Sequence, residues 1–322
     1  MSTNPETLLE AVRFFSDLDV CHEYMRRIKW PDGKIACPRC GSDRIGEIAT
    51  RHLLRCKACR KQFSYKVGTI FEDSPLGLDK WFVAVWAIAN CRNGISSHEL
   101  ARALGVTQKT AWFMLHRIRL AMECKSFSNF DGPAEADTTY IGGKAENMHA
   151  KRREKAITGR GAVDKTAVHG VIQRTKDEEH PSQVRASVID SETAITVLAE
   201  VRQNVRYGAE VYTDSAGAYG ELCFTHVHGT VDHSAGEYVV GDAHTNGAEN
   251  FWSLLKRSLK GTYVAVSPFH LFRYVEEQAF RFNHRLKSDF GRFHQALAQV
   301  VGKRLTYRVL GAVGDAGFMG IQ

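Results

Sequence analysis

Hydrophobic and polar residues follow two different periods along this chain of 322 residues, and the period changes near residue 134. Upstream of that point, apolar positions at helical spacing predict an amphipathic helical segment over 6–29. Residues 79–92 are apolar on most sides and predict a buried helix. Downstream, short alternating runs bounded by turn residues predict strands. These strands are expected over 134–141, 167–174, 184–190 and 210–214, with helices over 192–205, from 246 onward and over 268–287.

Four of the eight cysteines form two Cys-x-x-Cys pairs that are separated by fifteen residues. Each pair directs two thiolates to one point, and two pairs complete a tetrahedral zinc site without an open position. The residues between the pairs alternate like a short hairpin strand. This spacing favours metal binding over disulfides. A redox-active dithiol is disfavoured, because the strand–helix context that such motifs need does not surround these cysteines. The pattern predicts a zinc ribbon with one structural Zn²⁺ held by Cys37, Cys40, Cys56 and Cys59.

The segment 94–112 carries the signals of two helices joined by a tight turn. Ser96 and Glu99 match a capping box, Gly105 allows a sharp turn, and Thr107 can cap the second helix. These signals predict a helix-turn-helix, and an ordinary helical hairpin in a core stays an alternative. The second helix would offer Gln108, Lys109 and Thr110 to a DNA major groove.

Three acids and a lysine form the strongest chemical pattern in the chain. Asp137 and Asp214 lie on predicted strands, and Glu249 precedes Lys256 by seven residues on a predicted helix. Seven residues are almost two helical turns, so both side chains leave the same face. The three carboxylates can hold two Mg²⁺ or Mn²⁺ ions, and Lys256 with Arg257 can grip phosphates beside them. The pattern predicts phosphodiester chemistry with Asp137, Asp214, Glu249 and Lys256 as catalytic residues.

The order of these elements predicts a multidomain α/β protein. Three strands, a helix, a fourth strand and C-terminal helices describe a domain of ribonuclease-H type. We therefore expect an N-terminal helix and zinc ribbon over 1–70, a helix-turn-helix domain over 71–130, a ribonuclease-H-like catalytic domain over 131–300 and a C-terminal tail over 301–322.

The net charge of +7 and a sequence pI of about 9.0 favour a polyanionic partner. A basic loop between the first two predicted strands contains Lys151, Arg152 and Arg153, which are expected to contact DNA, with a solvated charge run as the alternative. No apolar run approaches the ~20 residues that span a bilayer. We expect a cytoplasmic, nucleoid-associated protein with no membrane contact.

Four histidines, His226, His228, His233 and His244, precede the predicted catalytic helix. A second zinc site is conceivable, but no ligand pair has helical spacing. Hydrogen bonding or proximity to DNA is the favoured role. His244, with Asn246 at the start of the helix, can help to orient a phosphate, because a helix N-terminus attracts anions.

Four stretches carry a resemblance to a known family: Trp30-Pro-Asp-Gly33, Asp137-Thr-Thr-Tyr-Ile-Gly-Gly-Lys144, Tyr212-Thr-Asp214, and the segment from His244 through Glu249 to Lys256-Arg257. The chain resembles bacterial insertion-sequence transposases of the DDE class, specifically the ISXO-like group with an N-terminal zinc ribbon. The resemblance runs from about Trp30 to Arg285.

This resemblance implies that Asp137, Asp214 and Glu249 are the DDE triad and that Lys256 is the associated basic residue. An acid commonly follows the first aspartate in this group, whereas this chain has Thr138, which is expected to point to the opposite strand face. Related groups have asparagine in the third position, so Asn246 is an alternative to Glu249.

The predicted function is that of an insertion-sequence DNA transposase. It would bind terminal inverted repeats and target DNA as a homo-oligomer, cleave the ends and join them with metal-dependent strand transfer. A catalytically silent, transposase-derived DNA-binding protein such as a repressor is one alternative. A general nuclease of ribonuclease-H architecture is another.

Overall fold

The structure, a computed structural model, describes residues 4–123, 128–142, 165–175, 177, 180–231 and 244–312. It divides into two compact units: Met1–Glu123 with His284–Gln322, and Cys124–Asn283. The domain boundaries expected from the sequence follow another division and stay predictions. Within the described residues, every helix is too short or too polar to span a bilayer.

The first unit begins with two helices where the sequence predicts one helical segment. They are α1 (Leu8–Phe15) and α2 (Leu18–Lys29). The break falls at Asp17, whose backbone is extended and whose side chain accepts a hydrogen bond from the backbone N–H of Asp19. Such a cap starts a new helix, because it satisfies an N–H group that has no partner within the helix.

A small antiparallel sheet with the order β1-β2-β3 follows. The residues between the cysteine pairs form two strands rather than one, with a left-handed residue, His52 (φ 48°), before the second strand. The strands are β1 (Ile45–Ile48), β2 (Leu53–Cys56) and β3 (Gln62–Ser64).

The rest of the first unit is helical. The predicted buried helix is α3, in which Trp81, Phe82 and Trp86 are almost fully buried. Phe82 and Trp86, with Phe15 and Phe293, build an aromatic core, and Trp81 packs against Phe71. The helices of this part are α3 (Leu78–Asn90), α4 (Ser97–Leu104), α5 (Gln108–Ala121), α10 (Asp289–Ala298) and α11 (Tyr307–Ala312).

The turn between α4 and α5 has the predicted chemistry. Ser96 and Glu99 form the capping box, and Gly105 has a left-handed backbone with φ 62°. The side chain of Thr107 accepts from the backbone N–H of Thr110 and caps α5. The capping box, the left-handed glycine and the second cap are therefore all present as the sequence predicts.

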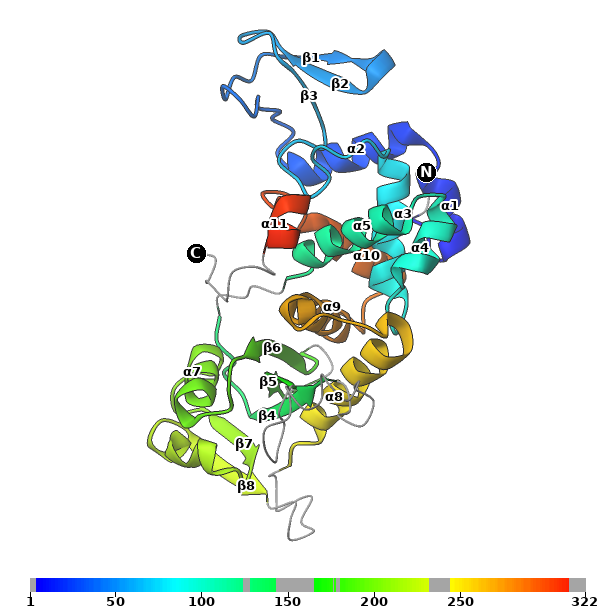
Figure 1. The fold of residues 1–322 in the computed structure, drawn as a ribbon. Coiled ribbons are helices and arrows are strands. Elements are labelled where there is room, and N and C mark those ends of the chain that lie inside the picture. Colours follow the sequence, from blue (N-terminus) through cyan, green and yellow to red (C-terminus); the bar gives the residue numbers. More distant parts are fainter. Residues whose placement is uncertain are drawn as a thin grey trace. The chain divides into compact units, whose positions relative to one another are not determined.

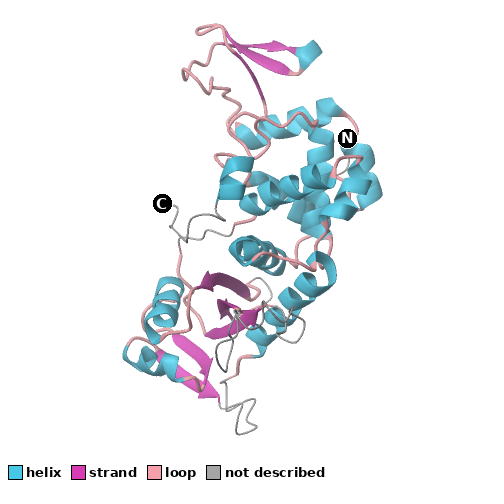
Figure 2. Ribbon diagram, in the orientation of Figure 1, coloured by secondary structure: helices cyan, strands magenta, loops and turns pink. Residues whose placement is uncertain are grey.

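The second unit is a mixed sheet with the order β6-β5-β4-β7-β8 and helices on both faces (Figure 1, Figure 2). Strand β5 pairs antiparallel with both β4 and β6, whereas β7 pairs parallel with β4 on one side and with β8 on the other. This arrangement is consistent with a ribonuclease-H-like domain. The strands are β4 (Ala134–Ile141), β5 (Thr166–Gln173), β6 (Gln183–Ile189), β7 (Glu210–Asp214) and β8 (Val227–Val231).

The alternating pattern predicts β4 and β7 with their observed bounds, and β5 and β6 within one residue. It misses β8, which lies at the edge of the sheet. Only Val231 of this strand is buried, so half-exposed and exposed positions leave no apolar alternation to detect.

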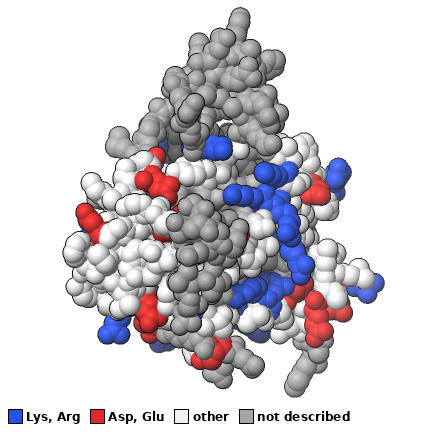
Figure 3. Space-filling view, turned by 90° about the horizontal axis from the view of Figure 1, so that it is seen from below, with Lys and Arg blue, Asp and Glu red and all other residues white. Residues whose placement is uncertain are grey.

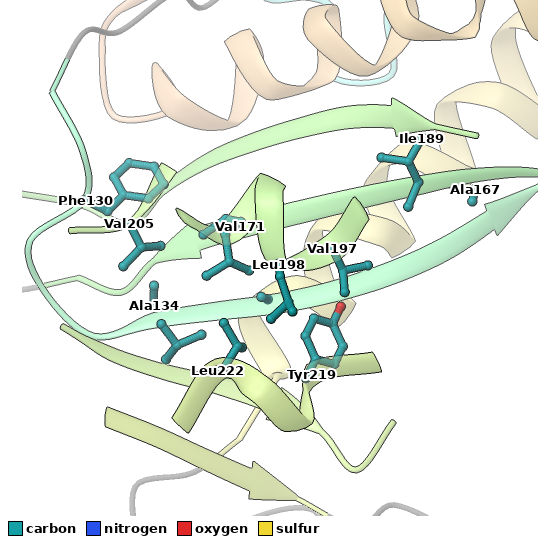
Figure 4. Close-up of a cluster of buried hydrophobic side chains, with 13 residues drawn as sticks. Phe130, Ala134, Ala167, Val171, Ile189, Val197, Leu198, Val205, Tyr219 and Leu222 are labelled. Atoms are coloured by element: carbon teal, nitrogen blue, oxygen red, sulfur yellow. The ribbon is translucent and has the colours of Figure 1, made fainter. Parts of the chain in front are cut away.

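One face of the sheet is covered by α7 (Ala194–Asn204) and the 3-10 segment η3 (Gly217–Phe224), as Figure 4 shows. Tyr219 and Leu222 from η3 meet Leu198 from α7 over the strands (Figure 4). The predicted helix 192–205 begins two residues late, because Thr193 serves as its cap.

The other face is covered by α8 and α9, whose apolar side chains pack on β5 and β6. The predicted helix 268–287 is shorter at both ends: its first turn is a 3-10 segment that starts at Pro268, and the α-helix ends at Asn283. The elements on this face are α8 (Asn246–Ser258), the π-helical turn η5 (Leu259–Tyr263), η6 (Pro268–His270) and α9 (Leu271–Asn283).

Candidate active site and metal centre

The four predicted zinc ligands converge in the first unit. The Sγ atoms of Cys37 and Cys59 lie 3.7 Å apart, and those of Cys40 and Cys56 lie 3.6 Å apart. All four sulfur atoms lie within 4.8 Å of one another. The backbone N–H of Cys59 donates to Cys56 Sγ at 3.4 Å and is the main cause that lowers the pKa of that thiol to about 6. This is the geometry of a closed tetrahedral site, which suits a structural Zn²⁺.

Asp137 lies on β4, on the face that α8 covers. Its Oδ2 atom accepts a hydrogen bond from the indole Nε1 of Trp252 on α8, at 2.8 Å. The neighbouring strand allows this contact through Gly170, which pairs with Asp137. A Cβ atom at Gly170 would lie 2.7 Å from the Trp252 ring. Only glycine leaves room there for the ring that orients the aspartate.

A pocket of about 580 Å³ opens at this point. Acidic side chains meet basic ones in its wall. Asp137 and Glu249 contribute the acids, and α8 with the following turn contributes three cations. The lining residues are Asp137, Thr139, Glu249, Trp252, Ser253, Lys256, Arg257 and Lys260.

Burial raises the pKa of Asp137 to about 6, the Trp252 hydrogen bond opposes that shift, and the charge of Asp214 adds to it. A buried carboxyl group beside a second carboxylate is costly to ionise in a protein interior. A bound cation offsets that cost, because it stabilises both carboxylates in their charged forms.

Asp214 ends β7 and does not line the pocket. The pairs Ala134–Val211 and Glu135–Tyr212 set the register of β4 and β7, and continuing the same register brings Asp214 beside Asp137. The backbone N–H of Ala216 donates to Asp214 Oδ1 at 3.3 Å. Among the described residues, the four cysteines are the only group of three or more potential metal ligands that lies close enough together to hold an ion, so the three acids are not gathered as tightly.

The helix α8 has the predicted amphipathic character. Phe251, Leu255 and Leu259 are buried and Leu254 is half-buried, as expected for the apolar stripe. Glu249 lies exposed in the first turn, and Asn246, the alternative third residue, is exposed at the first position of the helix. Only Glu249 of these two lines the pocket that contains Asp137.

Thr138 points to the opposite face of β4, as predicted. Its hydroxyl lies 3.4 Å from the Tyr219 hydroxyl on η3, within the face covered by α7. The position after the first aspartate therefore takes no part in the pocket.

Sequence reasoning missed Glu135, Arg174 and Trp252. Glu135 is 1% exposed and accepts a hydrogen bond from Arg174 Nε at 2.8 Å. A signal for Glu135 was present, because residues two apart on a strand share a face and Glu135 precedes Asp137 by two. Trp252 follows Glu249 by three residues, which places it one helical turn away.

The residues expected to contact DNA are only partly described. Lys151, Arg152 and Arg153 lie outside the described residues. On α5, Gln108 donates to Ser97 Oγ at 2.8 Å, and Lys109 lies 4.8 Å from the centre of the Tyr307 ring. Gln108 and Lys109 are exposed, whereas Thr110 is half-buried, so the exposure of these three residues decreases along the first turn of the helix.

Two of the four histidines form side-chain hydrogen bonds within the described residues. His228 Nε2 lies 2.9 Å from the Thr213 hydroxyl, and His226 Nδ1 lies 2.9 Å from the Thr225 hydroxyl. His244 lies at the start of α8, beside Glu135. His233 lies outside the described residues. Within the described part of the chain, no histidine belongs to a cluster of three metal ligands.

Comparison with known proteins assigns both parts of the chain to one family. Residues 129–283 match the ISXO2-like transposase domain, and residues 17–62 match the transposase zinc-ribbon domain. A protein of Halobacterium salinarum, described as an uncharacterized protein in transposable element ISH50, is 31% identical over 248 residues, which cover 73% of this chain and 81% of that protein. No solved structure matches the chain. The chain belongs to the family of ISXO2-like DDE transposases with an N-terminal zinc ribbon.

Proposed function

We propose that this protein is a DNA transposase that binds the terminal inverted repeats of its element, cleaves DNA at their ends and joins them to target DNA. One observation carries the proposal: the pocket that joins Asp137 and Glu249 to Lys256, Arg257 and Lys260. A phosphodiester backbone attracts cationic side chains, and its metal-assisted cleavage needs carboxylates that can hold divalent ions beside the scissile bond. Both sets of groups line this one pocket.

Asp137, Asp214 and Glu249 would hold two Mg²⁺ or Mn²⁺ ions. Their oxygen donors suit hard divalent cations, and the raised pKa of Asp137 beside Asp214 fits a site that a cation completes. When bound, the ions activate the attacking oxygen and stabilise the leaving one. Asn246 is the weaker choice for the third ligand, because it does not line the pocket.

Lys256, Arg257 and Lys260 would hold the phosphates of the substrate. Lys256 is half-buried, and Arg257 and Lys260 are exposed, so the three cations extend from the pocket to its rim. A guanidinium binds phosphate in a bidentate manner, whereas an ammonium acts as a point charge. Together they fix the backbone next to the carboxylates.

DNA ends would be recruited by the first unit. The exposed first turn of α5 offers Gln108 and Lys109, and α4 with α5 has the caps and turn of a helix-turn-helix. Lys and Arg side chains form a run on one side of the face in Figure 3, which suits contact with phosphates. Lys151, Arg152 and Arg153 would add to this contact. Synapsis of two ends calls for a homo-oligomer acting on double-stranded DNA at the nucleoid.

The test is cleavage and strand transfer on DNA that carries the element's ends, with Mg²⁺ or Mn²⁺. Asp137→Ala, Asp214→Ala and Glu249→Ala are each expected to lower the rate at least about 1000-fold, while end binding in a gel-shift assay stays unchanged. Asp190→Asn is the matched control, because this exposed acid directly follows β6 in the same sheet.

Full strand transfer by Asp214→Ala would refute the metal assignment. End binding without cleavage in any divalent metal would favour a silent, repressor-like DNA-binding protein. Degradation of DNA that lacks the repeats would favour a general nuclease.

Lys109→Ala is expected to weaken the binding of DNA ends. The salt dependence of the binding constant should fall by the amount that corresponds to about one phosphate contact. An unchanged salt dependence would show that α5 does not belong to the DNA interface.

A further inference from the structure

A buried carboxylate lies between β4 and the first turn of α8. Glu135 is 1% exposed, and its Oε2 atom accepts a hydrogen bond from the backbone N–H of Ala248 at 3.0 Å. Ala248 directly precedes Glu249. A buried acid therefore holds the backbone next to the residue that presents the third carboxylate.

The first turn of α8 depends on this remote contact. A helix start leaves backbone N–H groups without partners in the helix, and a local side chain usually accepts from one of them. The cap residue of α8, Thr245, makes no such side-chain hydrogen bond. Glu135 supplies the acceptor from the neighbouring strand, and its negative charge suits the positive end of the helix dipole.

Arg174 holds Glu135 in place. Arg174 Nε donates to Oε1 at 2.8 Å, and Arg174 Nη2 donates to the backbone oxygen of His244 at 2.7 Å. The guanidinium also lies 4.3 Å from the centre of the Tyr212 ring. His244 Nδ1 lies 3.2 Å from Oε1 without hydrogen-bond geometry, so it adds a charge contact only when protonated. Arg174 thus ties Glu135 to the segment that leads into α8.

The approach of helix and strand is close enough to require a glycine. A Cβ atom at Gly247 would lie 2.8 Å from Glu135 Oε2 and 3.3 Å from its carboxyl carbon. Because the carboxylate is held by Arg174 and Ala248, it cannot swing aside without losing those bonds. The contact therefore fixes the distance between the first turn of α8 and β4.

Strand β4 holds α8 at two points. Glu135 binds the Ala248 N–H, and Asp137, on the same strand face, accepts from Trp252 one turn later. We infer that Glu135 is a positioning residue that sets where α8 presents Glu249 to Asp137. The inference rests on the proposed function of these two acids as metal ligands. Glu135 itself is not expected to touch metal or DNA.

The experiment compares full-length wild type with Glu135→Gln, Glu135→Ala and the control Glu210→Ala, which truncates an exposed acid on β7. We expect Glu135→Ala to raise the Mn²⁺ concentration for half-maximal cleavage about tenfold or more, with end binding unchanged and activity partly restored at high Mn²⁺. Glu135→Gln keeps an acceptor for Ala248 but loses the charge, so a smaller shift is expected.

Two readouts do not need cleavage. Hydrogen–deuterium exchange of the amides at 247–251 is expected to become faster in Glu135→Ala and to stay unchanged in Glu210→Ala. Binding of Mn²⁺ alone, followed by electron paramagnetic resonance, is expected to weaken by the same factor as in the cleavage assay. Unaltered exchange, or an unaltered Mn²⁺ requirement in a folded Glu135→Ala protein, would overturn the inference.

A double-mutant cycle separates positioning from general loss of stability. Gly247→Ala is expected to impair Mn²⁺ binding in the wild-type background and to add little in the Glu135→Ala background, because the group it clashes with is gone. Additive effects would contradict the close contact. If the wild type binds Mn²⁺ but cleaves no DNA, the proposed function fails while exchange and Mn²⁺ binding still decide the role of Glu135.

Discussion

The indole Nε1 of Trp252 donates a hydrogen bond to Oδ2 of Asp137 at 2.8 Å, across the interface between α8 and β4. The same ring lies over Gly170, the residue that pairs with Asp137 on β5. One side chain therefore fills the helix–sheet interface and orients a carboxylate at the rim of the pocket. The indole N–H serves the candidate chemistry and the ring serves the packing. Different substitutions can therefore perturb the two roles separately.

Trp252→Phe keeps an aromatic ring in the interface but removes the donor. Hydrogen bonds to charged groups contribute about 1.5–3 kcal/mol, so we expect the rate of DNA cleavage to fall about tenfold or more with end binding unchanged. Single-turnover cleavage at saturating protein measures this effect. Wild-type rates in the variant would show that the indole N–H does not orient Asp137.

Gly170→Ala changes the packing instead. The added Cβ would lie 2.7 Å and 2.8 Å from two atoms of the six-membered part of the Trp252 indole. We expect a loss of about 1–3 kcal/mol in the free energy of unfolding, measured with urea. Gly220→Ala is the control, because a Cβ there meets nothing within 4 Å. Trp252→Phe lacks the clashing atoms, so adding it to Gly170→Ala is expected to recover part of the loss, and no recovery would argue against the clash.

Zinc content tests the cysteine cluster. Wild-type protein is expected to carry about one Zn²⁺ per chain, and Cys37→Ser or Cys56→Ser about none, because a structural site needs all four ligands. Elemental analysis of the purified proteins gives the ratio. Cys223→Ser serves as control, since this exposed cysteine lies outside the cluster and should leave zinc unchanged. A zinc-free wild type would contradict the ribbon assignment.

Acid stability should depend on His169. This buried residue of β5 has no hydrogen-bond partner for either ring nitrogen among the described residues, and burial lowers its pKa to about 4. A depressed folded-state pKa contributes stability above the unfolded value of about 6.5, and that contribution is lost as the pH falls toward 4. Between pH 7 and pH 5 the loss from this residue should be about 2 kcal/mol.

Urea unfolding of wild type and His169→Phe at both pH values isolates this contribution. The variant cannot take up the proton, so its stability should fall by about 2 kcal/mol less over the same range. Because each protein is compared with itself at two pH values, the effect of the substitution on packing energy cancels. Equal falls in both proteins would show that His169 is not the group that titrates.

Local rules were enough to predict much of the fold from the sequence. The alternation over Ala134–Ile141 and Glu210–Asp214 predicted both strands with their bounds, because side chains of alternating character point to opposite faces of a strand. The Ser96–Glu99 box and Gly105 gave the turn between α4 and α5, since capping and left-handed backbone depend on adjacent residues. Cysteine spacing likewise predicted the cluster, whose four sulfur atoms converge.

The candidate site was predictable only in part. Asp137, Glu249 and Lys256 line one pocket, as their positions on strand and helix suggested. The site residues themselves stay a proposal, and the position of Asp214 outside the pocket lining could not be foreseen. Sequence spacing gives the face of an element, whereas the distance between two elements depends on how their side chains pack.

The sequence by itself determined most of the helices and strands, which face of β4 carries Asp137 and which cysteines converge, because these features follow from short-range periodicity and spacing. Only the tertiary structure decided that Glu135 and Trp252 join β4 to α8, and that β8 extends the sheet. The two contacts between β4 and α8 link residues more than a hundred positions apart, as Glu135 to Ala248 shows. No local pattern encodes them, since they arise when the burial of apolar faces brings the helix onto the sheet.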